Sequence, residues 1–138
     1  MILPVLAVKD LDASVKFYTD KLGFKLDFNL AGPDGKPMTA AVSMPDNNGF
    51  LLNADSTLPQ RGQGVVFMIY LADDKDLDAY YAVLQAKGVH IVQPIKEEYW
   101  GDRVFSITDP NGFYLTFAKT VKQVSPDEIE KLAHSTNG

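Results

Sequence analysis

The sequence predicts an α+β fold in which two βαβββ modules form a curved mixed sheet with an open concave cleft, followed by a C-terminal helix. Two repeats lead to this prediction. The segment Lys9-Asp10-Leu11-Asp12-Ala13 recurs letter for letter at residues 75–79, and Asn48-Gly49-Phe50 recurs at residues 111–113. The same order of expected strands and helices surrounds both copies, which is typical of an internal duplication. One module cannot bury both faces of a four-stranded sheet, so we expect the two to pack together with their helices outside.

The expected organisation is a single domain over residues 1–138, with a first module at 1–54 and a second at 65–118. The polar stretch between them, residues 55–64, carries Gly and Pro and is typical of a linker. A tail helix is expected at residues 125–134. Ser125 suits its N-cap, Pro126 its first position and Glu128 the third position of a capping box.

In the first module an apolar strand is expected at residues 2–8, and Asp10 then begins a helix as its N-cap. Apolar residues at helical spacing continue this helix until Gly23 ends it. Alternating apolar and polar residues predict three further strands, at 24–30, 38–44 and 50–54, separated by turns that contain Gly or Pro.

The second module repeats this order. A β-branched strand is expected at residues 65–71, and a helix with one apolar face then runs to Gly88. Residues 89–92 are expected to form a short strand and residues 94–98 a loop. The turn Asp109-Pro110-Asn111-Gly112 then joins strands at 103–108 and 113–117.

Composition argues against several classes of function. The chain has 13 Lys and Arg against 18 Asp and Glu, a net charge of −5, whereas nucleic-acid phosphates require clustered cations. Cysteine is absent, so the chain has neither a disulfide framework nor a thiolate nucleophile. The N-terminal residues lack the features of a signal peptide, and no apolar run reaches membrane-spanning length. We therefore expect a cytoplasmic protein with no nucleic-acid or membrane partner.

Several motifs occur in a characteristic order: residues 8–18 with Leu22-Gly23-Phe24, and Asp109-Pro110-Asn111-Gly112-Phe113 before the last strand. In this order they resemble the vicinal oxygen chelate superfamily, which includes glyoxalase I, the bleomycin resistance proteins and the extradiol dioxygenases. Trp100-Gly101-Asp102-Arg103 resembles a segment of its PhnB-like branch. The resemblance covers residues 2–118. It implies paired βαβββ modules around a cleft, in a homodimer whose modules complete one another's clefts.

Metalloenzymes of this superfamily bind a divalent ion through one His or Glu from each of four strands. The resemblance places the corresponding positions at Leu3, Asn53, Val66 and Thr116. Leu and Val have no lone pair to donate, and Asn and Thr offer only neutral oxygens, which suit a divalent ion poorly. A shift by one residue would not restore a ligand set, so we expect neither the family metal nor another cofactor.

The resemblance and these residues together lead us to expect a small, partly apolar or aromatic ligand in the cleft. Trp100 offers a flat ring, and Arg103 offers a fork of donors for an anion. Alternatively, Trp100 packs against the sheet edge and Arg103 pairs with a nearby Asp. Asn53 and Thr116 would supply further polar contacts. The other candidate ligand-binding residues are aromatic, and core packing is their alternative role: Phe28, Phe67 and Phe105.

Two other classes of function stay open. The chain is alternatively a metal-dependent lyase, isomerase or dioxygenase whose active-site groups are non-standard, in which case Glu97 or Glu98 is a candidate acid or base. It is alternatively a partner-binding module, for which the tail helix is the one indication. The two histidines, His90 and His134, lie in different segments and do not predict a metal pair.

Overall fold

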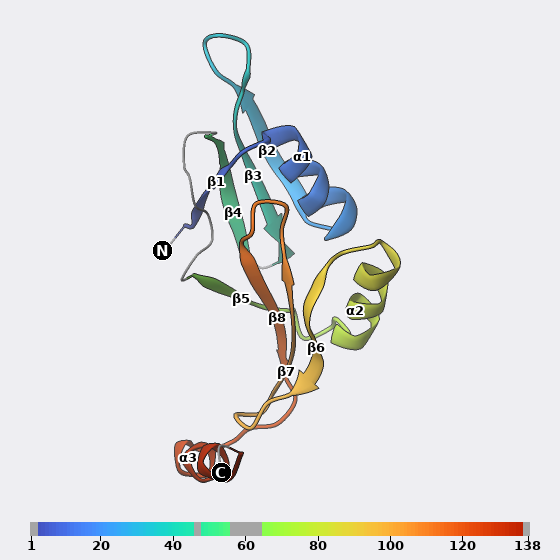
Figure 1. Cartoon of the computed structure of the whole chain (residues 1–138), viewed down its shortest axis with the longest axis vertical. Coiled ribbons are helices and arrows are strands. Elements are labelled where there is room, and N and C mark those ends of the chain that lie inside the picture. Colours follow the sequence, from blue (N-terminus) through green and yellow to red (C-terminus); the bar gives the residue numbers. More distant parts are fainter. Residues whose placement is uncertain (1–2, 46–47, 56–64, 137–138) are drawn as a thin grey trace.

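The repeat in the sequence corresponds to two sheets of the same topology in the computed structural model, which describes residues 3–45, 48–55 and 65–136. The sheets have the strand orders β1-β4-β3-β2 and β5-β8-β7-β6, and the pairs β1–β4 and β5–β8 are parallel (Figure 1). The α+β fold with two βαβββ modules and a C-terminal helix is therefore confirmed. The elements are β1 Val5–Val8, α1 Leu11–Lys16, η1 Phe17–Lys21, β2 Lys25–Ala31, β3 Pro37–Met44, β4 Asn48–Ala54, β5 Val66–Tyr70, α2 Leu77–Ala86, β6 Ile91–Glu97, β7 Asp102–Thr108, β8 Tyr114–Thr120 and α3 Pro126–Thr136.

The duplicated pentapeptide begins a helix in each module, as predicted. The Asp10 carboxylate accepts the Ala13 backbone N–H at 3.0 Å, and the Asp76 carboxylate accepts that of Ala79 at 3.2 Å. Gly23 and Gly88 both have a φ of 77°, so each ends its helix in the left-handed conformation that glycine adopts without strain. The sequence did not predict η1, a π-helical turn that continues α1.

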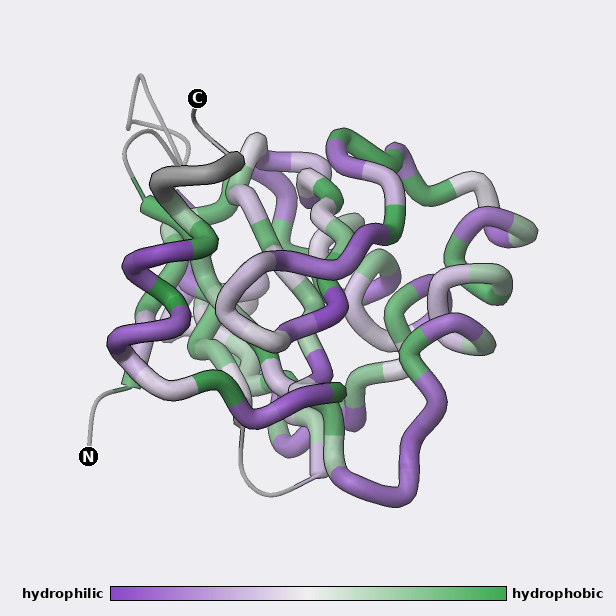
Figure 2. Tube along the Cα trace, turned by 90° about the horizontal axis from the view of Figure 1, so that it is seen from below, coloured by the Kyte–Doolittle hydropathy of each residue, from purple (hydrophilic) through white to green (hydrophobic). Residues whose placement is uncertain are grey.

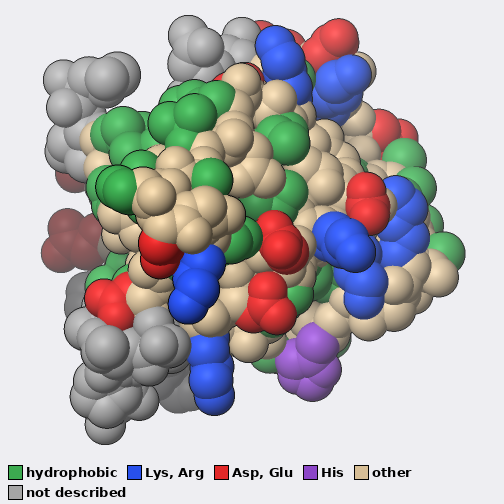
Figure 3. Space-filling model, turned by 90° about the horizontal axis from the view of Figure 1, so that it is seen from above, with side chains coloured by type: hydrophobic (Ala, Val, Ile, Leu, Met, Phe, Trp, Pro, Cys, Tyr) green, Lys and Arg blue, Asp and Glu red, His purple; other side chains and the backbone are tan. Residues whose placement is uncertain are grey.

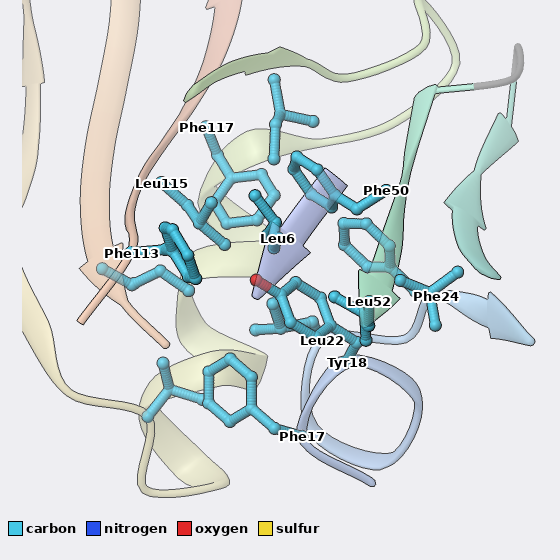
Figure 4. Close-up of a cluster of buried hydrophobic side chains, with 14 of the residues drawn as sticks. Leu6, Phe17, Tyr18, Leu22, Phe24, Phe50, Leu52, Phe113, Leu115 and Phe117 are labelled. Carbon is cyan, nitrogen blue, oxygen red and sulfur yellow. The ribbon is translucent and has the colours of Figure 1, made fainter. Parts of the chain in front are cut away.

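One hydrophobic core serves both modules. Helix α1 packs on β3 and β4, and α2 packs on β6, β7 and β8. Figure 4 shows Tyr18, Phe24 and Phe50 of the first module in the same cluster as β8 side chains of the second. The rings of Phe50 and Phe67 meet across the module boundary with centroids 5.0 Å apart. Each module therefore buries part of its apolar surface against the other module.

Two polar residues of the predicted turn at 109–112 connect the modules. Asn111 accepts the Lys9 backbone N–H and donates from its amide to the Ser14 hydroxyl, both at 3.0 Å. The buried Asp109 carboxylate accepts the Tyr18 hydroxyl at 2.8 Å. Desolvation and the Asp109 charge raise the pKa of Tyr18, which therefore stays a hydrogen-bond donor. The turn thus joins two strands and also attaches the second module to α1.

The strand β6 corrects one expectation. Residues 94–98 were expected to form a loop, but β6 extends through Pro94 to Glu97. Pro94 is tolerated because β6 is an edge strand and because its pairing with β7 is irregular between Gln93 and Lys96.

The tail helix α3 begins as predicted, with the Ser125 hydroxyl accepting the Glu128 backbone N–H at 3.2 Å. Figures 1 and 2 place α3 beyond the β7–β8 end, on the side away from α2, with alternating hydrophilic and hydrophobic segments. Of the expected linker, residues 56–64 lie outside the described residues. None of the helices within the described ranges is long and apolar enough to cross a membrane.

Candidate functional site

Each sheet has one face against α1 or α2 and an opposite face, which we call the open face (Figure 1). Successive side chains of a strand point to opposite faces. Phe50 and Leu52 of β4 are in the core, so Asn53 points to the open face. Phe105 and Phe117 pack on Tyr80 of α2, so Ser106 and Thr116 point to the open face of the second sheet.

Apolar side chains are exposed on the open faces of both modules. Phe28 on β2 is 41% exposed, and Met68 and Tyr70 on β5 are each 46% exposed. Figure 3 shows hydrophobic side chains gathered over the strands, on the left of that view. Contiguous exposed apolar surface of this kind marks ligand or protein contact sites.

The open face of each module carries one hydrogen-bonded pair of neutral polar groups. The Thr39 hydroxyl donates to the Asn53 amide oxygen at 2.6 Å, and the hydroxyls of Ser106 and Thr116 are 2.8 Å apart. Each pair joins residues that lie directly opposite in their antiparallel ladders. The internal repeat also aligns Asn53 with Thr116. Both modules therefore have a satisfied, uncharged pair at the same place. The pair of the first module is exposed, whereas Ser106 and Thr116 are buried.

Asp102, the first residue of β7, holds two aromatic rings in place. Its buried carboxylate accepts the Tyr70 hydroxyl at 2.7 Å, the Trp100 indole N–H at 2.9 Å and the Thr120 hydroxyl at 2.9 Å. The hydrogen bond to Asp102, and then burial, raises the pKa of Tyr70. The Tyr70 hydroxyl and the Trp100 indole N–H therefore both donate to the Asp102 carboxylate. We call these four residues the Asp102 cluster.

The sequence reasoning did not single out Asp102, although a signal was present. In the predicted strand at residues 103–108, alternation places Val104 and Ser106 on one face, and Asp102 continues that series. A carboxylate on a mostly buried strand face requires donors, and tyrosine and tryptophan side chains supply them.

The structure brings some of the predicted ligand-binding residues to the open face and places others elsewhere. Phe28, Asn53 and Thr116 lie on the open face, and Trp100 is bonded to a carboxylate on that face. Arg103 points away from it, 2.9 Å from the Asp78 carboxylate and 3.8 Å from that of Glu97. Phe105 lies in the core and Phe67 packs against it, on the helix side of their strands. Neither side chain therefore points to the open face.

The four positions that the resemblance assigns to metal ligands do not fit a metal here. Leu3 and Val66 have no donor atoms, the Asn53 oxygen already accepts the Thr39 hydroxyl, and Thr116 is bonded to Ser106. The parallel pairing also sets Ala7 beside Asn53 and Met68 beside Thr116, which adds no hard ligand. Within the ranges that the structure describes, no three His, Cys, Asp or Glu residues form a group that could bind a metal ion.

Comparison with known proteins gives the family. The profile of the Glyoxalase/Bleomycin resistance protein/Dioxygenase superfamily matches residues 2–117. Uncharacterized protein Mb0911c of Mycobacterium bovis is 30% identical over 137 residues, which cover 92% of this chain and 88% of that protein.

Two solved structures share the architecture. TnmS3, an antibiotic binding protein from Streptomyces sp. CB03234, is 25% identical with a TM-score of 0.69, over 86% of this chain and 93% of that chain. A glyoxalase-related enzyme from Clostridium phytofermentans is 26% identical with a TM-score of 0.70, over 87% and 94% of the two chains. The repeated βαβββ topology, the match over residues 2–117 and these relatives agree, and the chain belongs to the glyoxalase/bleomycin resistance protein/dioxygenase superfamily.

Proposed function

We propose that this protein binds a small, partly apolar or aromatic molecule on its open face, without the metal used by enzymes of its superfamily. The observation that supports this most is that exposed Met68 lies on the same face of β5 as exposed Tyr70, and that Tyr70 belongs to the Asp102 cluster, which fixes the Trp100 ring. Ligand sites combine apolar walls with a few fixed polar groups. Here the Asp102 cluster holds such groups in place, and the buried Ser106–Thr116 pair lies on the same sheet face.

Two comparisons bear on this proposal. TnmS3 is an antibiotic binding protein, so a relative of the same fold takes a small molecule. The second relative is a glyoxalase-related enzyme, which favours the alternative of a lyase, isomerase or dioxygenase. The metal content of the purified protein distinguishes the two. Stoichiometric zinc, nickel, manganese or iron after purification without added metal would overturn the metal-free proposal.

Tryptophan fluorescence provides the binding test, because Trp100 is the single tryptophan of the chain. Metal-free bleomycin and the neutral aromatic dye Nile red serve as probes. We expect saturable quenching of Trp100 emission by at least one of them below about 1 mM, and a loss of affinity of at least fivefold in Met68→Ala.

Val121→Ala is the matched control, since Val121 is an exposed apolar residue just beyond β8. It should leave the affinity unchanged. The proposal fails if neither probe quenches Trp100, or if Met68→Ala and Val121→Ala behave alike.

We further propose that two copies of the chain associate and complete one another's sites, and that the chain belongs to the PhnB-like branch. Edge strands β1 and β5 support the dimer, because Val5 and Val66 are more than half exposed on them. Exposed apolar edge strands favour pairing with another chain. Sedimentation velocity at micromolar concentration should give a dimer, and a monomer would contradict this.

The assignment to the PhnB-like branch rests on the segment Trp100-Gly101-Asp102-Arg103.

A further inference from the structure

A cavity lies at the boundary between the two modules, and none of the open-face polar pairs is among its wall residues. It has a volume of about 420 Å³ and we call it the seam cavity. The first module contributes its walls from the end of η1 and of β3, and the second contributes from the end of β5 and from α2. The principal wall residues are Leu22, Met44, Pro45, Leu71, Tyr80 and Val83.

Hydrogen bonds across the boundary hold these walls in position. The Tyr80 hydroxyl donates to the Leu22 carbonyl at 2.6 Å, and the Lys87 ammonium donates to the Asp20 carbonyl at 2.9 Å. Both bonds attach α2 to the end of η1. Gly23 also borders the cavity, and a Cβ placed there would meet no atom within 4 Å. Defined contacts between the two modules therefore hold the walls of the cavity in position.

The chemistry of the walls indicates the class of ligand. The Tyr70 and Tyr80 hydroxyls donate to Asp102 and to the Leu22 carbonyl, so these residues offer the cavity mainly ring surface. Asp76 also borders the cavity, but its carboxylate accepts the Ala79 backbone N–H and caps α2. Lys75 also borders the cavity, and no described residue forms an ion pair with its ammonium group. Apolar and aromatic walls with one cation at the margin suit a flat apolar body that carries a single negative charge.

We propose that the seam cavity is a second binding site, specific for small aromatic anions, formed by both modules of one chain. It does not depend on the proposed open-face function. Phe28, Asn53, Trp100 and Thr116 are not among its wall residues, and Tyr70 is the residue common to the cavity and the Asp102 cluster. Its volume lies in the range of known small-molecule pockets, about 300–1,000 Å³.

The probe for this site is 8-anilino-1-naphthalenesulfonate, an aromatic anion. Methionine methyl groups labelled with ¹³C report its position, because Met44 lines the seam cavity and Met68 lies on the open face. We expect the Met44 methyl signal to shift in a saturable manner while the Met68 signal stays in place. Lys75→Gln should weaken binding several-fold without changing which methyl group responds.

Two substitutions on α2 form a matched pair. Ala79 and Ala82 are both exposed on this helix, and only Ala79 lines the cavity. Ala79→Phe should reduce the affinity for the probe at least tenfold, and Ala82→Phe should not change it, with circular dichroism confirming that both variants fold.

Three results would overturn the proposal: no binding of the probe, a shift confined to the Met68 methyl, or equal effects of the two substitutions. A shift confined to Met68 would still be consistent with ligand binding on the open face. Conversely, a Met44 shift in a protein whose Trp100 responds to neither bleomycin nor Nile red would support the seam cavity and reject the open-face proposal.

Discussion

Asp109 is a single carboxylate on which the second module's turn and the first module's helix both depend. It accepts the backbone N–H groups of Asn111 and Phe113, each at 2.9 Å, and the Tyr18 hydroxyl at 2.8 Å. Burial raises the pKa of Asp109 above its ordinary value of 3.8, and the hydrogen bonds from Phe113, Tyr18 and Asn111 partly oppose that rise. Its protonation is therefore coupled to folding.

The first prediction concerns the titration of Asp109. Because its folded pKa is raised, the folded state binds the proton more tightly, so the stability gained from protonation is present below about pH 3.8 and is lost as pH rises through the folded value. Carboxyl ¹³C NMR should give a midpoint above 3.8, and Tyr18→Phe should raise it further by removing a donor to the charged form. A wild-type midpoint below 3.8 would contradict this account.

The second prediction concerns the Asp102 cluster. Asp102→Asn keeps the size of the side chain but replaces one of two acceptor oxygens with a donor. Either Thr120, or both Tyr70 and Trp100, then lose their acceptor, because the last two donate to the same oxygen. We expect a loss of about 1–3 kcal/mol in urea unfolding and a red shift of Trp100 emission.

Asp78→Asn serves as its control, because Asp78 pairs with Arg103 at the surface. The expected loss for that variant is at most about 1 kcal/mol, with no change in emission. Equal losses, or an unchanged spectrum in Asp102→Asn, would remove the positioning role that we give to Asp102.

At this scale the sequence predicted residue types better than residue directions. The Asp10 cap follows from a local pattern that the structure confirms, and Asp76, its copy in the repeat, caps α2 in the same way. Phe105 was included among the candidate ligand contacts for its aromatic ring, yet its place in the strand pairs it with Phe117 in the core. Arg103 pairs with an Asp, as one of its two predicted alternatives had it, but the partner, Asp78, comes from a helix that is distant in sequence. Such directions depend on tertiary contacts that local patterns do not contain.

Among the elements, the β6–β7 connection depends most on one glycine. Gly101 has a φ of +101°, and a Cβ on it would collide with the Lys122 carbonyl oxygen. Its own carbonyl accepts the backbone N–H groups of Val121 and Lys122, at 2.9 and 3.1 Å. This close approach fixes the segment that carries Trp100 and Asp102.

The third prediction compares two glycines. Gly101→Ala should lower the free energy of unfolding by more than about 2 kcal/mol, because conformational strain and a backbone collision act together. Gly23→Ala should cost about 1–2 kcal/mol, since its φ is +77° but nothing lies within 4 Å of a Cβ there. Urea denaturation of both variants decides this, and a cost for Gly101→Ala no greater than that for Gly23→Ala would contradict the collision.

The strand β6 shows why element boundaries were harder to predict than element order. Pro94 and the two glutamates after Lys96 are poor strand residues, so local pattern ended the strand early. In the structure β7 provides a partner along the whole segment, and the irregular pairing accommodates the proline at a sheet edge. Pairing with a neighbour outweighed the local preference.

For the whole molecule, the shared core predicts that the two modules unfold together. Phe50 meets Phe67, and Tyr18 bonds to Asp109, so neither sheet keeps its buried face when the other opens. The repeat made two modules foreseeable from the sequence. The open cleft was likewise predicted, but the seam cavity was not, because it depends on how the ends of η1, β3 and β5 pack against α2.

The fourth prediction tests this coupling. Leu52→Ala removes a fully buried side chain of β4 and should cost about 2–5 kcal/mol. Hydrogen exchange should accelerate in β7 and β8 as much as in β3 and β4. Leu26→Ala, at a 40% exposed leucine of the same sheet, should have a much smaller effect. Acceleration confined to the first sheet would show instead that the modules open independently.

Tyr70 has a position with a consequence for how this protein would respond to two molecules at once. Tyr70 borders the seam cavity, and its hydroxyl donates to Asp102 in the Asp102 cluster. An occupant that displaces this ring from one side alters the anchoring of the indole on the other. If both proposed sites bind, thermodynamic reciprocity requires that each ligand change the affinity for the other by an identical factor, so the shared Tyr70 side chain would couple the two sites.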